Sequence, residues 1–372
     1  MVYDTRVLKT LRSLSKKYAV LALGWDRNRL YNKDKLCNEL IWKGNSATRP
    51  VIKILHVNAP FNQDSLASYL PLIVYFPVFW VWTFLNLAKA RPKIVHACDL
   101  DTLPPCYLYK IFFRKKVVFD VYDRYAMTLI PARFKTLHSI VNLVEEFFSK
   151  RSDVLINISE EVLRTFKNKP KKSILIMNSP EDVVVNKSRS KQDDVLSIVY
   201  TGAVWKDTRG LENIIQATKG ISNIEFLLAG WYREQDKKFL DEISQIPYVK
   251  FKGLLQPKES LELEASSDVL IALYDPNLPL YHVTLPNKLF EAMMCGIPLI
   301  TNVASRMVNE VGFGIIVQYD DITGIREAIL TLKESPSLRQ KLGLSGRKAY
   351  LEKYSWSKME QELFKTYATL LE

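Results

Sequence analysis

The chain has 372 residues, a length that predicts two domains of ordinary size. Of these residues 48% are hydrophobic and 25% are charged, a composition that excludes a disordered protein and predicts a globular one. Its four cysteines form no CxxC pair and have no histidine at ligand spacing, which argues against a zinc site or a disulfide scaffold and favours a cytoplasmic protein. The net charge of +12 is uneven, about +15 for residues 1–190 and about −3 for residues 191–372. The basic half favours an anionic partner, such as nucleic acid, a membrane surface or a phosphorylated lipid, although a solvated basic surface would give the same count.

Short β-branched runs alternate with longer helical patterns through the first half of the chain. This alternation is typical of an α/β domain, in which helices cover both faces of a parallel sheet. Helical periodicity predicts helices over Ile140–Phe148 and Glu160–Phe166. The predicted strands are Tyr18–Leu23, Val51–Val57, Lys93–Ala97, Lys116–Val121, Val154–Asn157 and Ser173–Met177.

The segment Tyr69–Ala88 contains no charged residue and is rich in Leu, Val, Phe and Trp. It is just long enough to span a membrane, but Pro71 and Pro77 disfavour a straight helix and a span would divide the first domain. A buried helix is one alternative. A helix at a membrane interface is the other, and the aromatic content and the cations that follow the segment favour it. We therefore expect peripheral contact with the cytoplasmic face of a membrane.

A polar stretch, Asn186–Asp194, predicts a linker between a first domain, residues 1–185, and a second, residues 195–355, with a last amphipathic helix over 356–372. The alternation resumes after the linker. We predict two doubly wound parallel sheets of the Rossmann-like kind that face a cleft, with ligands at the carboxyl ends of the strands. The predicted strands are Leu196–Thr201, Ile224–Ala229, Val249–Lys252, Val269–Tyr274, Ile297–Thr301 and Gly314–Val317. The predicted helices are Gly210–Thr218, Asp236–Ile243, Pro257–Glu264, Asn287–Cys295, Ile322–Lys333 and Trp356–Leu371.

The segment Pro286–Glu291 is the strongest candidate for a ligand site. Proline fits the first position of a helix, and Gly296 ends that helix. The free N–H groups of the first turn, together with Lys288, suit a diphosphate. Glu291 lies three residues on, on the same helix face, and can accept both hydroxyls of a ribose. The alternative is a surface Lys–Glu pair.

Three loops that follow predicted strands are further candidates. In the first, Gly202 ends a strand and Arg209 precedes the next helix, where it can grip phosphate in a bidentate way or be a surface cation. Lys206 in the same loop is a second cation. The other two loops contain Trp231, which can flank a base or be an ordinary aromatic, and the pair Gly253 and Leu254.

Two loops of the first half also carry polar side chains. Asp99 and Asp101 form an Asp-x-Asp motif, which binds a metal in some proteins but is common by chance. Tyr122 and Asp123 follow the next predicted strand. A phenol can donate or accept a hydrogen bond but does not titrate near neutrality.

The segment around Pro286 resembles the donor-site signature of family 4 glycosyltransferases, in the Pro-Asn-Lys-Leu form that some members carry. The resemblance implies the GT-B fold and a donor site for a nucleotide diphosphate sugar, with the ribose on Glu291. Many members carry a second glutamate that approaches the transferred sugar, at the position of Val283 here. The residues that the resemblance assigns to the donor are Gly202, Lys206, Arg209, Trp231, Gly253, Leu254, Leu285, Pro286, Asn287, Lys288 and Glu291.

In the first half, Val95–Asp101 is similar to an interdomain loop of many family members, and Val118–Tyr125 resembles a turn whose His lies near the transferred sugar. Tyr122 and Asp123 stand at the His-Glu positions of that turn, and the phenol of Tyr122 can hydrogen-bond a sugar hydroxyl. The resemblance implies that Asp99, Asp101, Tyr122 and Asp123 lie on the cleft and acceptor side. Tyr3–Lys9 resembles the loop after the family's first strand, so we expect the missing strand to lie upstream. The resemblance also implies that the closing helix crosses back onto the first domain.

The resemblance implies a retaining glycosyltransferase that moves a sugar to a lipid-linked or glycan acceptor. Arg209, Lys288 and Glu291 are the expected catalytic residues, and neither a metal nor another cofactor is expected. The alternative is a catalytically silent partner of a membrane-associated glycan assembly complex, because Val283, Ala203 and Tyr122 replace familiar residues. A GT-B epimerase or phosphorylase is a further enzyme alternative, whereas no motif supports nucleic-acid binding.

Overall fold

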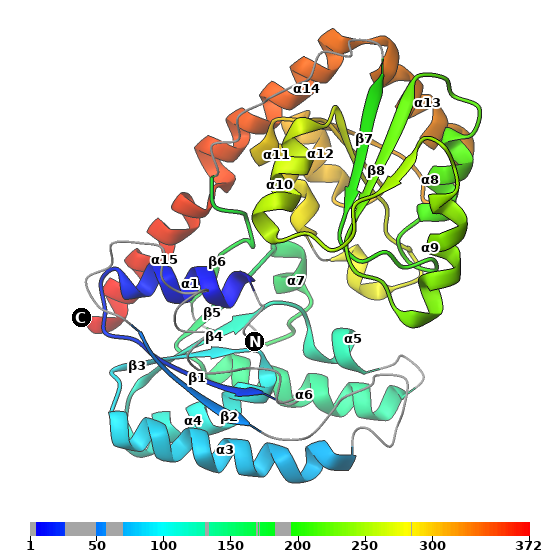
Figure 1. Cartoon of the computed structure of the whole chain (residues 1–372). Helices are drawn as coiled ribbons and strands as arrows, with labels where there is room; N and C mark the ends of the chain where they lie inside the picture. The colour runs from blue at the N-terminus through cyan, green and yellow to red at the C-terminus, as the bar shows by residue number, and fades with distance from the viewer. Residues whose placement is uncertain are drawn as a thin grey trace. The chain divides into compact units, whose positions relative to one another are not determined.

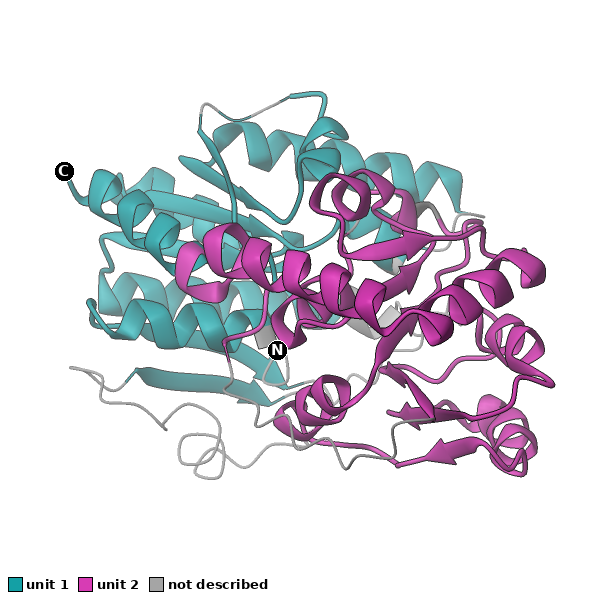
Figure 2. Ribbon diagram, turned by 90° about the horizontal axis from the view of Figure 1, so that it is seen from above, with its two compact units in different colours: residues 1–178, 359–372 teal, residues 179–358 magenta. Residues whose placement is uncertain are grey.

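The structure is a computed structural model that describes residues 5–26, 50–56, 70–130, 134–168, 170, 172–182, 195–283 and 285–372. The chain forms two compact units, coloured separately in Figure 2. Unit 1 comprises residues 1–178 and 359–372, and unit 2 comprises residues 179–358. The predicted linker over 186–194 lies outside the described residues.

Unit 1 contains two parallel sheets. The first pairs β1 (Leu21–Asp26) with β2 (Val51–His56), and the second has the order β3-β4-β5-β6. Within the described residues these sheets are not hydrogen-bonded to each other. Strands β3 to β6 span Ile94–Cys98, Lys116–Val121, Val154–Asn157 and Ser173–Leu175, so the six strands predicted in this half are confirmed to within a few residues.

Two layers of helices cover the four-stranded sheet. Figure 1 shows α1 and α15 on one side of these strands and α3, α4 and α6 on the other. Val117, Phe119 and Val121 alternate along β4 with Val118 and Asp120, and all five are buried, as expected for a strand covered on both faces. The helices of unit 1 are α1 (Thr5–Ser15), α3 (Leu70–Ala90), η2 (Leu100–Thr102), α4 (Leu103–Phe113), α5 (Tyr125–Leu129), α6 (Lys135–Arg151), α7 (Glu160–Arg164) and α15 (Trp356–Leu371).

The opening segment differs from its predicted form. Residues 5–9, expected in a loop, form the first turns of α1, while Tyr3 and Asp4 lie outside the described residues. The physical reason is the helical spacing of apolar residues, since Leu11 and Leu14 are buried on one face of the helix. The expected upstream strand stays a prediction.

From Met359 onward, helix α15 packs within unit 1. The Tyr367 hydroxyl lies 2.8 Å from Nδ1 of His96 on β3, and Lys16 donates to Glu360 over 2.6 Å. Arg6 on α1 is also buried and forms an ion pair of 2.5 Å with Asp120. Burial opposes ionisation of Asp120, but Arg6 and the hydrogen bond from His96 hold the pKa of this carboxyl below its usual value.

The segment expected at a membrane interface is α3, which continues through Pro77. None of the helices in the described part of the chain is long and apolar enough to cross a membrane. Phe79 and Leu87 are buried, whereas Val81 and Leu85 are exposed, so α3 has an inner and an outer face.

Unit 2 is built on one six-stranded parallel sheet with the order β12-β11-β10-β7-β8-β9, a doubly wound topology. Figure 1 shows α8, α9 and α13 on one side and α10, α11 and α12 on the other. The predicted strands are confirmed as β7 (Leu196–Thr201), β8 (Ile224–Ala229), β9 (Val249–Phe251), β10 (Val269–Ala272), β11 (Leu299–Thr301) and β12 (Gly314–Ile316). The helices are α8 (Leu211–Thr218), η3 (Glu234–Asp236), α9 (Lys237–Ser244), α10 (Pro257–Ser266), η4 (Pro279–His282), α11 (Asn287–Cys295), α12 (Ser305–Val311), α13 (Ile322–Glu334), α14 (Pro336–Ala349) and the π-helix η5 (Tyr350–Tyr354).

Candidate active site

Three glycines bring the loops after β7, β8 and β9 into backbone contact. The N–H of Gly202 donates to Ala229 over 2.9 Å, and the N–H of Gly230 donates to Gly253 over 2.8 Å. A Cβ atom on Gly230 would lie 1.6 Å from the carbonyl oxygen of Gly202. Both residues have positive φ, 136° and 146°, which side chains disfavour. The glycines therefore form a tightly packed floor at the carboxyl end of the sheet.

Helix α11 begins beside this floor. Asn287 is its first helical residue and Pro286 is the N-cap, one position earlier than predicted, because Pro286 has an extended ψ of 144°. No side chain among the described residues caps the helix start, so its first N–H groups keep their capacity to bind an anion. Gly296 ends the helix with a φ of 64°, as the sequence predicts.

Lys288 and Glu291 meet at the first turn of α11 and form an ion pair. They are not a surface pair, because their side chains are only 16% and 17% exposed. The ammonium of Lys288 also donates to Thr201 at the end of β7 and, over 2.8 Å, to Glu264 on α10. One cation therefore connects the sheet and two helices.

Glu264 is the member of this cluster that sequence reasoning missed. Its side chain is fully buried and accepts hydrogen bonds from Thr201 and Lys288. The available signal was a glutamate between Leu263 and Ala265, which faces inward on α10.

The charges of the cluster depend on one another. Burial raises the pKa of Glu264, while Lys288 opposes that rise and Glu291 adds to it. Burial disfavours the Lys288 ammonium, but the two carboxylates hold its pKa above the usual value. Lys288 is therefore a cation at neutral pH, and a diphosphate would compete with carboxylates for it.

Arg209 lies in an aromatic frame. Its guanidinium carbon is 4.9 Å from the ring centre of Trp205, 5.2 Å from that of Tyr274 and 5.4 Å from that of Tyr281. Its buried Nε has no hydrogen-bond partner among the described residues. The rings hold the guanidinium by cation–π contact and leave donor capacity for an incoming anion.

The hydroxyl of Tyr200 feels the charge of both cations. Burial raises the pKa of its hydroxyl to about 12, and both Arg209 and Lys288 act in the opposite direction. The hydroxyl donates to Ala203 over 2.6 Å, which shapes the loop after Gly202. Each cation acts on the Tyr200 phenol, although Arg209 lies in the loop before α8 and Lys288 lies on α11.

Other predicted donor residues are more exposed or have no described contact with Lys288 or Arg209. Trp231 is 49% exposed and meets Trp205 edge-on, with 5.2 Å between ring centres. Leu254 is exposed and Leu285 is half-buried. Lys206 pairs with Glu212 over 3.2 Å, and no described contact joins it to Lys288 or Arg209.

The four candidate residues of the first half lie in unit 1. Asp99 accepts a hydrogen bond of 3.2 Å from the backbone N–H of Tyr122, which fastens the loop after β3 to the loop after β4. The ring of Tyr122 lies 4.9 Å from the Arg6 guanidinium, a cation–π contact that the sequence did not indicate. The backbone carbonyl of Asp101 accepts from Trp80 over 2.7 Å, and Asp123 lies half-buried beside Tyr122. Among the described residues, no cluster of His, Cys, Asp and Glu could hold a metal ion.

The chain is similar in sequence to known proteins. Residues 196–335 match the family model for "Glycosyl transferases group 1", so unit 2 contains a domain of this type. A relative by sequence is the GDP-mannose-dependent monoacylated alpha-(1-6)-phosphatidylinositol monomannoside mannosyltransferase of Corynebacterium glutamicum, 22% identical over 194 residues. The alignment spans about half of this chain and half of that relative.

Solved structures resemble the whole chain. Sucrose-phosphate synthase of Thermosynechococcus elongatus superposes with a TM-score of 0.72 at 16% identity, over 98% of this chain and 92% of the other. Anabaena HepE in complex with UDP and glucose gives a TM-score of 0.70 at 13% identity, over 99% and 96%. These likenesses confirm the predicted GT-B fold class, with its two Rossmann-like domains.

Proposed function

We propose that the protein is a glycosyltransferase that moves a sugar from a nucleotide diphosphate sugar to a lipid-linked or glycan acceptor, with retention of the anomeric configuration. The observation that carries the proposal is the meeting of Lys288 and Glu291 at the uncapped start of α11, beside the glycine floor. This is a place where a helix start, a cation and a ribose-binding carboxylate serve one ligand.

The proposed roles follow from charge. In the reaction, the bond between the anomeric carbon and the diphosphate breaks, and the departing diphosphate takes up negative charge. Arg209, Lys288 and the N–H groups of α11 stabilise that charge, which lowers the barrier electrostatically. The acceptor oxygen forms the new glycosidic bond and passes its proton to the departing phosphate, so neither a metal nor a protein base is required.

The proposed role of Glu291 is to hold the ribose of the donor through both ribose hydroxyls. Its carboxylate is partly exposed and its partner Lys288 is fixed by Glu264, so the position of Glu291 is set before the donor arrives. The remaining donor contacts are assigned to the floor glycines, with Trp231 beside the base.

Two observations support an anionic, lipid-linked acceptor. The first 190 residues carry about +15, and the name of the Corynebacterium relative joins a nucleotide sugar donor to a phosphatidylinositol-based acceptor. The proposal includes peripheral contact with the cytoplasmic face of a membrane. Asp99, Asp101, Tyr122 and Asp123 are assigned to the acceptor side.

A panel of nucleotide sugars tests donor binding by thermal shift, since a ligand that binds the folded state raises the melting temperature. Turnover of the stabilising donor is then measured in Glu291→Ala and Arg209→Ala, with Glu262→Ala and Lys258→Ala as controls in an exposed ion pair on α10. We expect turnover to fall at least about a hundredfold in the first pair and to stay unchanged in the controls. Donor binding without turnover in the wild type would instead identify a catalytically silent partner protein, and no binding of any nucleotide sugar would refute the proposal.

A further inference from the structure

Exposed apolar side chains gather on three helices of unit 1. Of the twenty large hydrophobic residues that are exposed in the described part of the chain, twelve lie on α3, α4 and α6. Such a concentration on one layer marks an interaction site, whereas single exposed apolar residues are ordinary. The twelve residues are Val74, Val78, Val81, Leu85, Leu108, Ile111, Phe112, Leu137, Ile140, Leu143, Val144 and Phe147.

The spacing of these residues makes a stripe on each helix. On α3 they recur at intervals of four, three and four residues from Val74 to Leu85, and on α4 they occupy Leu108, Ile111 and Phe112. These intervals keep side chains on one helix face.

The three helices are neighbours in one layer. Phe84 of α3 lies 5.9 Å from Phe112 of α4, and Tyr107 of α4 lies 6.2 Å from Phe147 of α6, measured between ring centres. Figure 1 shows the layer beneath the strands of unit 1. We call the outward side of this layer, defined by the twelve exposed residues, the apolar face.

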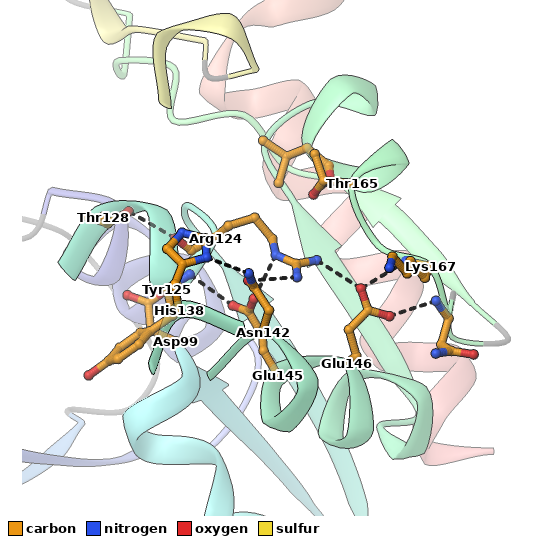
Figure 3. Close-up of polar contacts among 12 residues, drawn as sticks. Asp99, Arg124, Tyr125, Thr128, His138, Asn142, Glu145, Glu146, Thr165 and Lys167 are labelled. Atoms are coloured by element: carbon orange, nitrogen blue, oxygen red, sulfur yellow. Dashed lines mark hydrogen bonds and ion pairs between the residues drawn. The ribbon is translucent and has the colours of Figure 1, made fainter. Parts of the chain in front are cut away.

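No carboxylate is exposed on the described residues of α3, α4 and α6. Helices α3 and α4 contain no Asp or Glu, and the two glutamates of α6, Glu145 and Glu146, are buried. Figure 3 shows both carboxylates turned toward Arg124, which lies 2.8 Å from Glu145 and 3.3 Å from Glu146. The acids of this layer are therefore neutralised inside unit 1.

Cations gather along one edge of the same layer. Helices α3, α4 and α6 lead directly into β3, β4 and β5, which are adjacent and parallel, so the three helix ends lie along one edge. The cations at these ends are Lys89, Arg91, Lys93, Arg114, Lys115, Lys116, Lys150 and Arg151. Among the described residues at this edge the carboxylate is Asp153, which pairs with Lys110 over 2.7 Å and with Lys116 over 3.8 Å.

We propose that the apolar face of α3, α4 and α6 docks onto an anionic lipid bilayer, with the basic edge in contact with the lipid head groups. The charge distribution favours an anionic bilayer as the partner. A surface with apolar stripes, a row of cations and no exposed carboxylate among its described residues is complementary to an anionic lipid interface. Each cation near such a surface contributes about 1 kcal/mol, so the whole edge supplies a strong and salt-dependent attraction. The membrane contact expected for the Tyr69–Ala88 segment alone is thereby extended to three helices. Docking of this kind does not require sugar transfer.

The test is flotation of the full chain with vesicles of phosphatidylcholine alone or with about one third phosphatidylglycerol. We expect binding only to the anionic vesicles, with release at about 0.5 M salt, where exposed charges are screened. Ile111→Glu and Leu143→Glu, at positions 55% and 72% exposed, should each weaken binding at least about tenfold without lowering the melting temperature. Leu344→Glu, at a position of unit 2 that is 62% exposed, is the matched control and should bind as the wild type does.

Three results would overturn the inference. The first is no association with anionic vesicles at low salt, and the second is equal loss of binding in Leu344→Glu. The third is a wild-type chain that self-associates without binding vesicles and becomes monomeric in Leu143→Glu, which would make the apolar face an interface between copies. Sugar transfer to a water-soluble acceptor, measured in the same variants, separates this inference from the proposed function, because transfer should be unchanged.

Discussion

Each unit contains a cluster of one cation and two glutamates, and the two clusters differ in what surrounds them. In unit 1, Arg124 binds Glu145 and Glu146, whose carboxylates also accept backbone N–H groups from Tyr125, Lys167 and Asn168. In unit 2, Lys288 binds Glu264 and Glu291. The charges are the same, but Arg124 is only 4% exposed whereas Lys288 is 16% exposed.

The two clusters differ in how completely other groups of the protein cover and hydrogen-bond their charged side chains. Arg124 is covered by the ring of Phe166, 4.0 Å away, and its acids are tied to a loop and to α5, so the cluster fastens elements of unit 1 together. Lys288 instead lies at an uncapped helix start beside a glycine floor. The first cluster should therefore act on stability and the second on ligand binding.

The largest expected effect is on the unit 1 cluster. Arg124→Met leaves two buried carboxylates without their cation, so we expect the free energy of unfolding to fall by about 3–5 kcal/mol. Urea unfolding measures the change. Arg164→Met, at an exposed ion pair with Glu160, is the control and should change stability by less than about 1 kcal/mol. A small effect of Arg124→Met would mean that the cluster does not fasten unit 1.

The unit 2 cluster should respond in catalysis. Lys288→Met removes a cation that we assign to the departing diphosphate, and loss of one such group lowers kcat by about 100- to 1000-fold. The melting temperature should fall less than in Arg124→Met, because Glu264 can take up a proton and Glu291 reaches solvent. Initial rates at saturating donor give the answer, and unchanged rates would exclude Lys288 from the reaction.

The sequence predicted the elements of both units better than it predicted these clusters. Strand periodicity is local, so β7 to β12 could be found from short windows, and the helix start at Asn287 could be found from its proline. The partners of Lys288 depend on α10 packing beside α11, a contact between segments that no local pattern reports. The Arg209 frame likewise needs Tyr274 and Tyr281, which lie some seventy residues further along the chain.

Burial gives the unit 1 cluster a pH dependence. It raises the pKa of Glu145 from the usual 4.5 to about 7, with Arg124 opposing the rise. The folded protein therefore holds a proton that the unfolded chain has released, so this stabilisation is complete below pH 4.5 and is lost as the pH rises to about 7. At about 1.4 kcal/mol per unit of pKa, the whole change is at most about 3.5 kcal/mol.

Glu145→Gln removes this titration. We expect its unfolding free energy, relative to the wild type, to rise between pH 4.5 and about 7 and to be level outside that range. Glu160→Gln, at a site 59% exposed, should show no such rise. A relative stability that is flat across the range would show that Glu145 ionises normally in the folded state.

The smallest expected effect is on the affinity for a nucleoside diphosphate, which should change in the unit 2 cluster and not in the unit 1 cluster. Glu264→Gln keeps an oxygen for Lys288 and Thr201 but removes one of the two negative charges that compete with a diphosphate for Lys288. If removal of this charge lowers the competition with phosphate by about 1 kcal/mol, the nucleoside diphosphate should bind about fivefold more tightly. Calorimetric titration measures this change, with Glu145→Gln as the matched control in the closed cluster, where affinity should stay the same. Weaker binding in Glu264→Gln would mean that the buried charge of Glu264 holds Lys288 in its binding position and does not compete with the ligand.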